Sequence, residues 1–553
     1  MTGRPPALVR LRPLLLDLLA GLLVASAAFA VIGTLLGTGW QPYFLRDGDS
    51  LALPLIVQSL LSGEPLQWVM TSQLFFFPEL PLYAISSVAG SPSASLLLNG
   101  VLNVVVLFAL VRWVSALVLV DRAVWLRRAA ATATILLFLL LCLSETRALN
   151  NVGALATTFL LTTYYHGSVL VAVGGLALIL RLLDPAARGR AFGGVLLVVL
   201  VAATSLSNPL LLVHFTAPGL LGLASLWLTA QLPGRRAVAL AGLLLGGSIL
   251  GSLARLPLAS FVAADASTYI RTPLAGPALT SLLEQIADVK STPKGLVELI
   301  TIGFLLLAAL ALVLVRVRGL TRRGQGGEAA GASPASRVVS HRSWFLCVFV
   351  LSEAGVLLAV QVASGSSVSR YLMPIAVFSC LVLLPLLGLV RVRARRRLRL
   401  AAAGSAVVVA SSVLLTTVGA SGAERALADG PLGADAACVK DWIGGRDIEG
   451  VGSFWIVRPL ALYDSLPVQQ VNPDFSVQVW MSNLASYDED FSFVLVDPAS
   501  PWPGATEDAF GPPARTIDCG AIQIYDYAGT AGQQRLDEVI ASSLEKARRT
   551  YGY

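Results

Sequence analysis

The sequence is poor in charged residues, and especially poor in lysine and histidine. Charged side chains make up 13% of its 553 residues, whereas about a quarter of the residues of an average soluble protein are charged. The three histidines, His166, His214 and His341, are too scattered for a histidine-rich metal site. We find no zinc-ligand spacing, phosphate-binding glycine loop or nucleophile elbow. These absences exclude an ordinary soluble protein and most enzyme classes that a short motif would reveal.

Apolar residues are present in excess and form long uninterrupted runs. They make up 56% of the chain, and the mean hydropathy is +0.74. A helix needs about 20 mainly apolar residues to cross the hydrocarbon core of a bilayer. Eleven stretches satisfy this condition, near 14–37, 95–120, 129–149, 166–183, 191–207, 210–230, 237–256, 295–315, 343–363, 371–390 and 400–420. The sequence therefore predicts a mainly α, polytopic membrane protein, with a further short interfacial helix at 152–165.

The distribution of arginine predicts the orientation of these spans. Twenty-three arginines fall in the amino-terminal segment and in alternate loops, against seven Lys or Arg in the opposite loops before residue 421. Because basic loops stay in the cytoplasm, the amino terminus is expected inside and the carboxyl terminus outside. This topology accounts for the basic pI of about 9.3, so the pI gives no reason to expect nucleic-acid binding.

After residue 420 the composition becomes that of a soluble domain. We therefore predict a transmembrane domain at 1–420 and a small extracytoplasmic α/β domain at 421–553. Strand-like runs, rich in β-branched and aromatic residues, occur at 453–457, 476–480, 491–496 and 521–525, and an amphipathic helix is predicted at 533–549. Cys438 and Cys519 lie in this domain; outside the cytoplasm they either form a disulfide or remain two buried thiols.

An acidic pair follows the first span, where the chain leaves the bilayer. Asp47 and Asp49 are two residues apart in the sequence Phe-Leu-Arg-Asp-Gly-Asp-Ser. Carboxylates beside hydrocarbon are costly unless they are paired or serve a function. One of them is a candidate base that accepts a proton from a hydroxyl, or a ligand for a divalent cation. The alternative is a structural acid that pairs with Arg46 or caps a helix.

The first long loop resembles that of the GT-C superfamily of membrane glycosyltransferases. The resemblance rests on a first span, an acidic motif, an amphipathic segment that ends in glycine at 50–65, and the segment Phe75–Tyr83. The lipid A aminoarabinose transferases and the protein O-mannosyltransferases are the most similar members. The resemblance implies an inverting hexosyl or pentosyl transfer from a polyprenyl-phosphate sugar, with the acidic residue at the catalytic centre. The family has an Asp-Glu pair where this chain has Asp47-Gly-Asp49, which leaves open the identity of the catalytic carboxylate.

Basic residues on the outer face are candidates to bind the donor phosphate. Arg370 opens a span at the level of the lipid headgroups, and a guanidinium can hold phosphate through two hydrogen bonds. The neighbouring Tyr371 is a second candidate, although both residues also suit an interfacial anchor. Lys290 and Lys294, in the loop before the eighth span, are further candidates that also fit lysines extending to the membrane surface.

Four more polar residues are expected on the same face. His166 begins the fourth span, and Glu145 and Arg147 follow the third, where they can contact substrate or simply pair with each other. Glu79 lies in the Phe-Pro-Glu-Leu-Pro segment of the first loop. Each residue is a candidate substrate contact, and for His166 the structural alternative is a hydrogen-bonded core histidine.

Two classes of function fit this pattern, and a transferase fold that has lost its activity is a third option. The first is a glycosyltransferase that moves a sugar from a polyprenyl-phosphate donor to an acceptor in the cell envelope. The second is a membrane protein without enzymatic activity: a lipid-linked-sugar flippase, an exporter or a scaffold subunit. Apart from Glu353, which lies within a span, the candidate ionisable residues gather toward the outer ends of the spans and not at the midplane, where transporters bind their substrates, so the first class is favoured. The high content of Arg, Ala, Gly and Leu is typical of a GC-rich bacterium, which predicts a plasma-membrane location.

Overall fold

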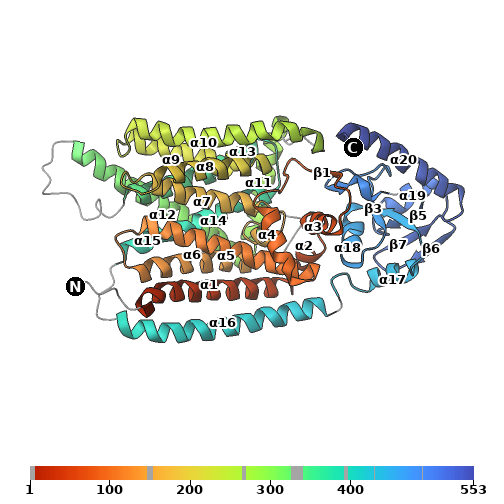
Figure 1. Cartoon of the computed structure of the whole chain (residues 1–553), viewed down its shortest axis with the longest axis horizontal. Coiled ribbons are helices and arrows are strands. Elements are labelled where there is room, and N and C mark those ends of the chain that lie inside the picture. The colour runs from red at the N-terminus through yellow and green to blue at the C-terminus, as the bar shows by residue number, and fades with distance from the viewer. Residues whose placement is uncertain are drawn as a thin grey trace.

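The computed structural model describes residues 7–145, 154–263, 270–324, 340–390, 397–428, 430–487 and 490–553. A long bundle of helices occupies most of the molecule, and an α/β domain covers one end of it (Figure 1). The carboxyl terminus lies in that domain, beside the end of the bundle (Figure 1). The predicted class, a helical membrane protein with a small α/β domain, is confirmed.

Helices occupy all eleven predicted spans. Within the described residues, nine helical stretches are long and apolar enough to cross a bilayer, and the shorter helices α7 and α9 fill the two remaining positions. The bundle consists of α1 (Ala7–Leu35), α5 (Pro92–Val118), α6 (Val124–Ser144), α7 (His166–Leu182), α8 (Arg190–Ser207), α9 (Ala217–Leu228), α10 (Gly234–Arg255), α12 (Pro293–Gly324), α13 (His341–Ala363), α14 (Met373–Leu381), α15 (Leu383–Leu389) and α16 (Arg397–Leu427). The expected interfacial helix at 152–165 is reduced to a single 3-10 turn, Thr157–Leu160, within its described part.

Close contact between glycines packs α16 against α1 at the edge of the bundle (Figure 1). A Cβ atom on Gly33 would overlap the backbone of Gly419, and one on Gly422 would overlap Gly33. Small residues allow helix backbones to approach closely inside a membrane, where packing and not the hydrophobic effect drives association. The predicted domain boundary at residue 421 falls inside α16, which continues to Leu427.

The first loop forms a layer of short elements at the end of the bundle. It contains α2 (Gln41–Leu45), α3 (Ala52–Ser62), β1 (Trp68–Val69) and α4 (Glu79–Ser86). The helix α3 stops at Gly63, whose φ of 73° suits a glycine in a left-handed helix cap. The second long outer loop contributes α11 (Ala275–Lys290). In Figure 1, α2 and α3 lie between the bundle and the α/β domain.

The α/β domain is built on a five-stranded sheet of order β3-β2-β5-β7-β6. Both β2 and β3 run parallel to β5, while β7 and β6 follow as an antiparallel hairpin. Its strands are β2 (Glu449–Gly452), β3 (Val468–Gln470), β5 (Phe491–Val496), β6 (Arg515–Asp518) and β7 (Gln523–Asp526), and its helices are α17 (Ala434–Ile443), α18 (Phe454–Asp464), α19 (Trp502–Phe510) and α20 (Ala531–Tyr551). Thus β5 matches the run predicted at 491–496, and α20 contains the predicted terminal helix.

Two of the predicted strands are wrong. Residues 453–457 form the start of α18, because the buried residues Phe454, Val457 and Arg458 recur at the three-to-four-residue spacing of a helix. Residues 476–480 make a single bridge, from Val477 to Val471, and no strand. A short run of β-branched and aromatic residues is thus compatible with a helix or a loop as well as with a strand.

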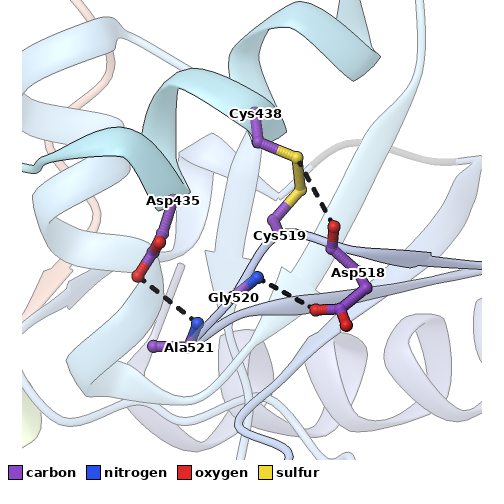
Figure 2. Close-up of a disulfide and its surroundings, with 6 residues drawn as sticks. All are labelled: Asp435, Cys438, Asp518, Cys519, Gly520 and Ala521. Atoms are coloured by element: carbon purple, nitrogen blue, oxygen red, sulfur yellow. Dashed lines mark hydrogen bonds between the residues drawn. A yellow bond between two sulfur atoms is a disulfide. The ribbon is translucent and has the colours of Figure 1, made fainter.

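A disulfide links α17 to the turn between β6 and β7, where Cys438 is bonded to Cys519 (Figure 2). Beside it, the Gly520 amide donates to the Asp518 carboxylate, and the Ala521 amide donates to Asp435. The sequence left open whether these cysteines form a disulfide or remain two buried thiols, and in the structure they form the disulfide. The two cysteines are 81 positions apart in the sequence.

A second, two-stranded sheet fastens the α/β domain to the first loop. In it β1 pairs antiparallel with β4 (Ser482–Asn483), so that Trp68 lies opposite Asn483. The Asn483 side chain also accepts from the Gln67 amide, and the Tyr553 hydroxyl donates to the Trp68 carbonyl. The α/β domain is thus hydrogen-bonded to the layer that carries the acidic pair.

Candidate functional site

The acidic pair lies in the short turn between α2 and α3, and its two carboxylates have different partners. One oxygen of Asp47 accepts three hydrogen bonds: from the Ser50 amide at 3.0 Å, from the Ser50 hydroxyl at 3.1 Å and from the Tyr164 hydroxyl at 2.9 Å. The Ser50 contacts are local and close the turn that begins α3. Asp47 therefore holds the loop in shape and ties it to the segment that precedes α7.

Asp49 makes an ion pair with a distant basic residue. Its Oδ2 lies 3.2 Å from a guanidinium nitrogen of Arg370, which is 321 positions away in the sequence. The Arg370 guanidinium also lies over the Tyr164 ring, 5.2 Å from its centre. Both side chains of the pair are about one-fifth exposed, 22% for Asp49 and 21% for Arg370. The pair is therefore shielded from bulk water but still reachable by a ligand.

Burial changes the acidity of Asp47. Its desolvation, followed by the negative charge of Asp49, raises the pKa of Asp47 to about 7, while the hydrogen bonds from Tyr164 and Ser50 oppose the shift. Two adjacent carboxylates resist a double negative charge, and burial weakens solvation of that charge. Arg370 faces Asp49 and neutralises it. Near neutral pH Asp47 can thus carry a proton.

The α/β domain holds the acidic turn from the opposite side. The buried side chain of Arg458, on α18, donates to the Gly48 carbonyl at 2.8 Å and to the Gln470 side chain at 2.9 Å. Its guanidinium stacks on the Phe454 ring at 4.2 Å. A Cβ atom on Gly48 would overlap that ring, so only glycine fits between the two aspartates.

A cavity of about 480 Å³ opens at Asp49, between the acidic turn and the α/β domain. Its other walls include Phe454 and Trp455 from the start of α18, and Asn472, Gln478 and Trp480 from the segment between β3 and β4. Asp49 thus contacts Arg370, at the end of the helix bundle, and also borders the cavity. A carboxylate in this position can accept a proton from a group bound in the cavity, while a cation is available beside it.

Tyr371, Glu79 and His166 lie near the acidic turn without forming part of it. The Tyr371 ring packs against Tyr165, with centres 5.4 Å apart. The buried carboxyl of Glu79 lies against Gly167 at the first turn of α7, where a Cβ atom would overlap it. Burial raises the pKa of Glu79 to about 7. His166 is buried with its ring edge-on to Phe159, and its role as a substrate contact or as a core histidine stays a prediction.

The remaining candidates are placed elsewhere. Glu145 accepts hydrogen bonds from the amides of residues 155, 156 and 157 and so caps that segment. Lys290 and Lys294 are exposed at the junction of α11 and α12. No ion pair involves either lysine within the described part of the chain. Arg147 lies outside the described residues.

Sequence reasoning missed the contributions of Tyr164 and the α/β domain. Tyr164 belongs to the Tyr-Tyr-His segment at the start of the fourth span. These polar residues before an apolar helix were the feature that could have identified Tyr164 as a site residue. Arg458, Trp455 and Trp480 lie in segments that resemble ordinary strands and helices. Within the described ranges, no cluster of three or more His, Cys, Asp or Glu residues is positioned to hold a metal ion.

The chain matches no family model, and no curated protein matches its sequence. Its fold is similar to the crystal structure of ArnT from Cupriavidus metallidurans bound to undecaprenyl phosphate, with a TM-score of 0.50 and 12% sequence identity. The similarity covers 91% of this chain and 98% of that one. The chain therefore has a GT-C-like fold, in agreement with the resemblance of its first loop. At this identity the similarity establishes the fold alone, and function has to be argued from the site.

Proposed function

We propose that this protein is a membrane glycosyltransferase that moves a sugar from a polyprenyl-phosphate donor to a hydroxyl of an acceptor outside the cytoplasm. The observation that carries the proposal is the pairing of Asp49 with Arg370 at the mouth of a cavity. A base and a phosphate-binding cation at the outer end of a membrane bundle are what this reaction requires. The GT-C-like fold supports the same class of reaction.

Arg370 is proposed to bind the donor phosphate. It belongs to a 3-10 turn, Ser369–Leu372, at the outer end of a span, which is the depth of a lipid headgroup. A phosphate binds a guanidinium through two charge-assisted hydrogen bonds. It therefore competes with Asp49 for Arg370 and frees the carboxylate when the donor arrives. The neighbouring structure, ArnT, is described with undecaprenyl phosphate bound, which supports a lipid-phosphate donor here.

Asp49 is proposed as the base and Asp47 as the residue that positions it. The acceptor oxygen attacks the anomeric carbon, the bond from that carbon to the phosphate oxygen breaks, and its electron pair leaves with the phosphate beside Arg370. The proton of the acceptor hydroxyl passes to Asp49. A single displacement of this kind inverts the anomeric configuration. Asp47 shapes the turn through its contacts with Ser50 and Tyr164.

The proposal includes a location. With the amino terminus in the cytoplasm and the α/β domain outside, the site opens to the outer surface of a bacterial plasma membrane. An acceptor of the cell envelope is then accessible, and the donor reaches the site within the bilayer. A divalent cation is compatible with the two carboxylates, but the chemistry above is assigned to residues of the chain alone.

The test is sugar transfer from a radiolabelled polyprenyl-phosphate sugar in membranes that contain equal amounts of each variant. Asp49→Asn keeps the shape of the side chain and removes proton acceptance, so kcat should fall by at least the ~10² typical of general-base loss. Asp508→Asn, an exposed acid on α19, is the matched control. Arg370→Ala should weaken donor binding, whereas Arg549→Ala on α20 should not.

Wild-type turnover in the Asp49→Asn variant would exclude this residue as the base. If Asp47→Asn and the double variant also kept wild-type turnover, the catalytic proposal would be wrong. A flippase, exporter or scaffold function would then be the better account of the fold.

A further inference from the structure

The cavity at Asp49 combines aromatic surface with amide groups. Trp455 and Trp480 contribute indole rings, and Gln478 and Asn472 contribute amides. Trp455 is 57% exposed although it begins a packed helix, and its ring meets Phe454 edge-to-face with centres 4.8 Å apart. Such exposure leaves a large flat surface available to a ligand. Sites for small organic ligands are built in this way, from apolar walls and a few polar groups that fix orientation.

Charge is nearly absent from this cavity. Among the described residues that line it, Asp49 is the one ionisable side chain. Arg458 lies behind the Phe454 ring, where protein acceptors occupy its donors. An anionic ligand would therefore meet the Asp49 carboxylate without a cation on the same wall. A fully apolar ligand would offer no partner to the Gln478 amide, whereas Asp49 is paired with Arg370 and the Asn472 amide donates to Ser476 and Val477.

We infer that this cavity binds the acceptor, and that the acceptor is a neutral carbohydrate. A sugar ring has an apolar face of C–H groups that packs on an indole, and it carries hydroxyls at its edge that exchange hydrogen bonds with amides. A cavity of about 480 Å³ lies within the ~300–1,000 Å³ of small-ligand sites. It accommodates the end of a glycan and not a long chain.

The position of the cavity explains how two substrates reach one carboxylate. Asp49 pairs with Arg370 of the helix bundle and borders the cavity, whose other walls come largely from the α/β domain. The lipid donor approaches through the bilayer and the acceptor glycan approaches from outside. This inference rests on the proposed function, which supplies the donor side. It adds the acceptor class and assigns acceptor recognition to α18 and to the segment between β3 and β4.

A competing role for Trp455 is that of an anchor at the membrane surface, where tryptophan is common. An anchor and a sugar platform predict different results. Loss of an anchor lowers stability or membrane insertion and leaves glycan binding intact. Loss of a platform lowers glycan binding and leaves both stability and insertion unchanged.

The first experiment measures glycan binding without any donor, using the full-length protein in lipid nanodiscs. An array of neutral oligosaccharides, uronic-acid oligosaccharides and sugar phosphates provides the probes, and calorimetry gives the affinity of each ligand found. Neutral glycans should bind, and the acidic ones should not. Trp455→Ala and Gln478→Ala should each weaken binding about tenfold or more, as truncated contacts at the centre of a site do. Trp455→Phe should retain most of the affinity.

Trp227→Ala is the matched control, because Trp227 is 54% exposed near the end of α9, in the bundle and away from the cavity. Its glycan affinity should equal that of the wild type. Preference for acidic ligands, absence of any glycan binding, or neutral-glycan binding that Trp455→Ala does not alter would each overturn the inference.

The second experiment separates this inference from the proposed function. In the transfer assay, Trp455→Ala should raise KM for the acceptor and leave kcat and donor affinity little changed, because it removes binding common to ground and transition states. Neutral-glycan binding without any sugar transfer would reject the proposed function and keep the binding site. Transfer that depends on Asp49 but has an acceptor KM insensitive to Trp455→Ala would reject the site and keep the function.

Discussion

Asp47 and Asp49 are two residues apart, yet their contacts give them separate roles. Asp47 accepts from Ser50 and Tyr164 and so organises the turn. Asp49 pairs with Arg370 and reaches the cavity. Gly48 separates the two aspartates in the sequence. Of the two, Asp49 is the better candidate for chemistry because it alone borders the cavity.

The raised pKa of Asp47 predicts a pH-dependent difference in stability between the wild type and Asp47→Asn. Below about pH 4 this carboxyl is protonated in both folded and unfolded states. Between about pH 4 and 7 the unfolded chain releases the proton while the folded protein keeps it, so this residue destabilises the fold progressively as the pH rises. An asparagine has no such cost.

Asp47→Asn should therefore gain stability over the wild type from pH 4 to 7, and the gain should level off above pH 7. At ~1.4 kcal/mol per unit of pKa shift, the gain is at most roughly 4 kcal/mol. Thermal unfolding of the purified proteins between pH 4.5 and 8.5 measures it, with Asp508→Asn, a substitution of an exposed acid, as the control. A stability difference that stays constant over this range would contradict the raised pKa.

At the level of elements, α18 supports the acidic turn. Arg458 donates to the Gly48 carbonyl, and Phe454 lies against the Gly48 Cα. Phe454 lies in the run 453–457 that the sequence predicted as a strand, and Arg458 follows directly after it. In a strand, residues 454 and 458 would share a face but would lie well apart along the chain. In the helix they lie one turn apart and are neighbours. The α/β domain thus forms part of the site.

This packing predicts that Gly48→Ala impairs transfer more than it impairs folding. The added methyl group overlaps the Phe454 ring, so the turn must shift and carry Asp49 away from its position. Misplacement of a reacting group by about 1 Å can cost ~10² in rate, and we expect a loss of at least tenfold in kcat. Gly504→Ala on α19, where a methyl group meets open space, is the control.

The amount of folded protein in detergent, measured by size-exclusion chromatography, separates the two effects of Gly48→Ala. A normal rate in this variant would show that the turn tolerates a side chain. In that case α18 would not position Asp49.

At the level of the whole molecule, the bundle and the α/β domain form one functional unit. The pairing of β1 with β4, the Tyr553 contact to Trp68 and the Arg458 contact to Gly48 all join the two parts. In the proposed function the bundle supplies the donor side of the site and the α/β domain supplies the acceptor side. The proposal therefore requires both parts to lie on the outer face of the membrane.

The predicted topology can be measured with reporters. Alkaline phosphatase, which is active only outside the cytoplasm, should be active when fused after Gly430. A fluorescent reporter that folds only inside should be fluorescent when inserted after residue 330. The physical reason is the excess of arginine in the loops predicted to be cytoplasmic. The reverse pattern would place the Asp49 cavity in the cytoplasm and would exclude an acceptor of the cell envelope.

The sequence by itself determined the elements whose signal is local. Eleven apolar runs became helices because a membrane span is specified by length and hydrophobicity alone. The strand at 491–496 and the terminal amphipathic helix were also predicted, since each is a continuous pattern. Residues 453–457 were misassigned because a short apolar run fits either a strand or a buried helix. The acidic pair was found because charge at a membrane exit is rare.

Only the tertiary structure decided which residues meet at the site. Asp49 and Arg370 are 321 positions apart, and Gly48 and Arg458 are 410 positions apart. No periodicity or spacing connects residues at such separations, because their proximity depends on how helices pack and on how the α/β domain docks. For the same reason the sequence could not exclude Lys290, Lys294 and Glu145 as further candidates beside Arg370. The predicted topology indicated that these residues lie at the same end of the spans. It did not indicate which of them are neighbours, because that depends on how the helices pack.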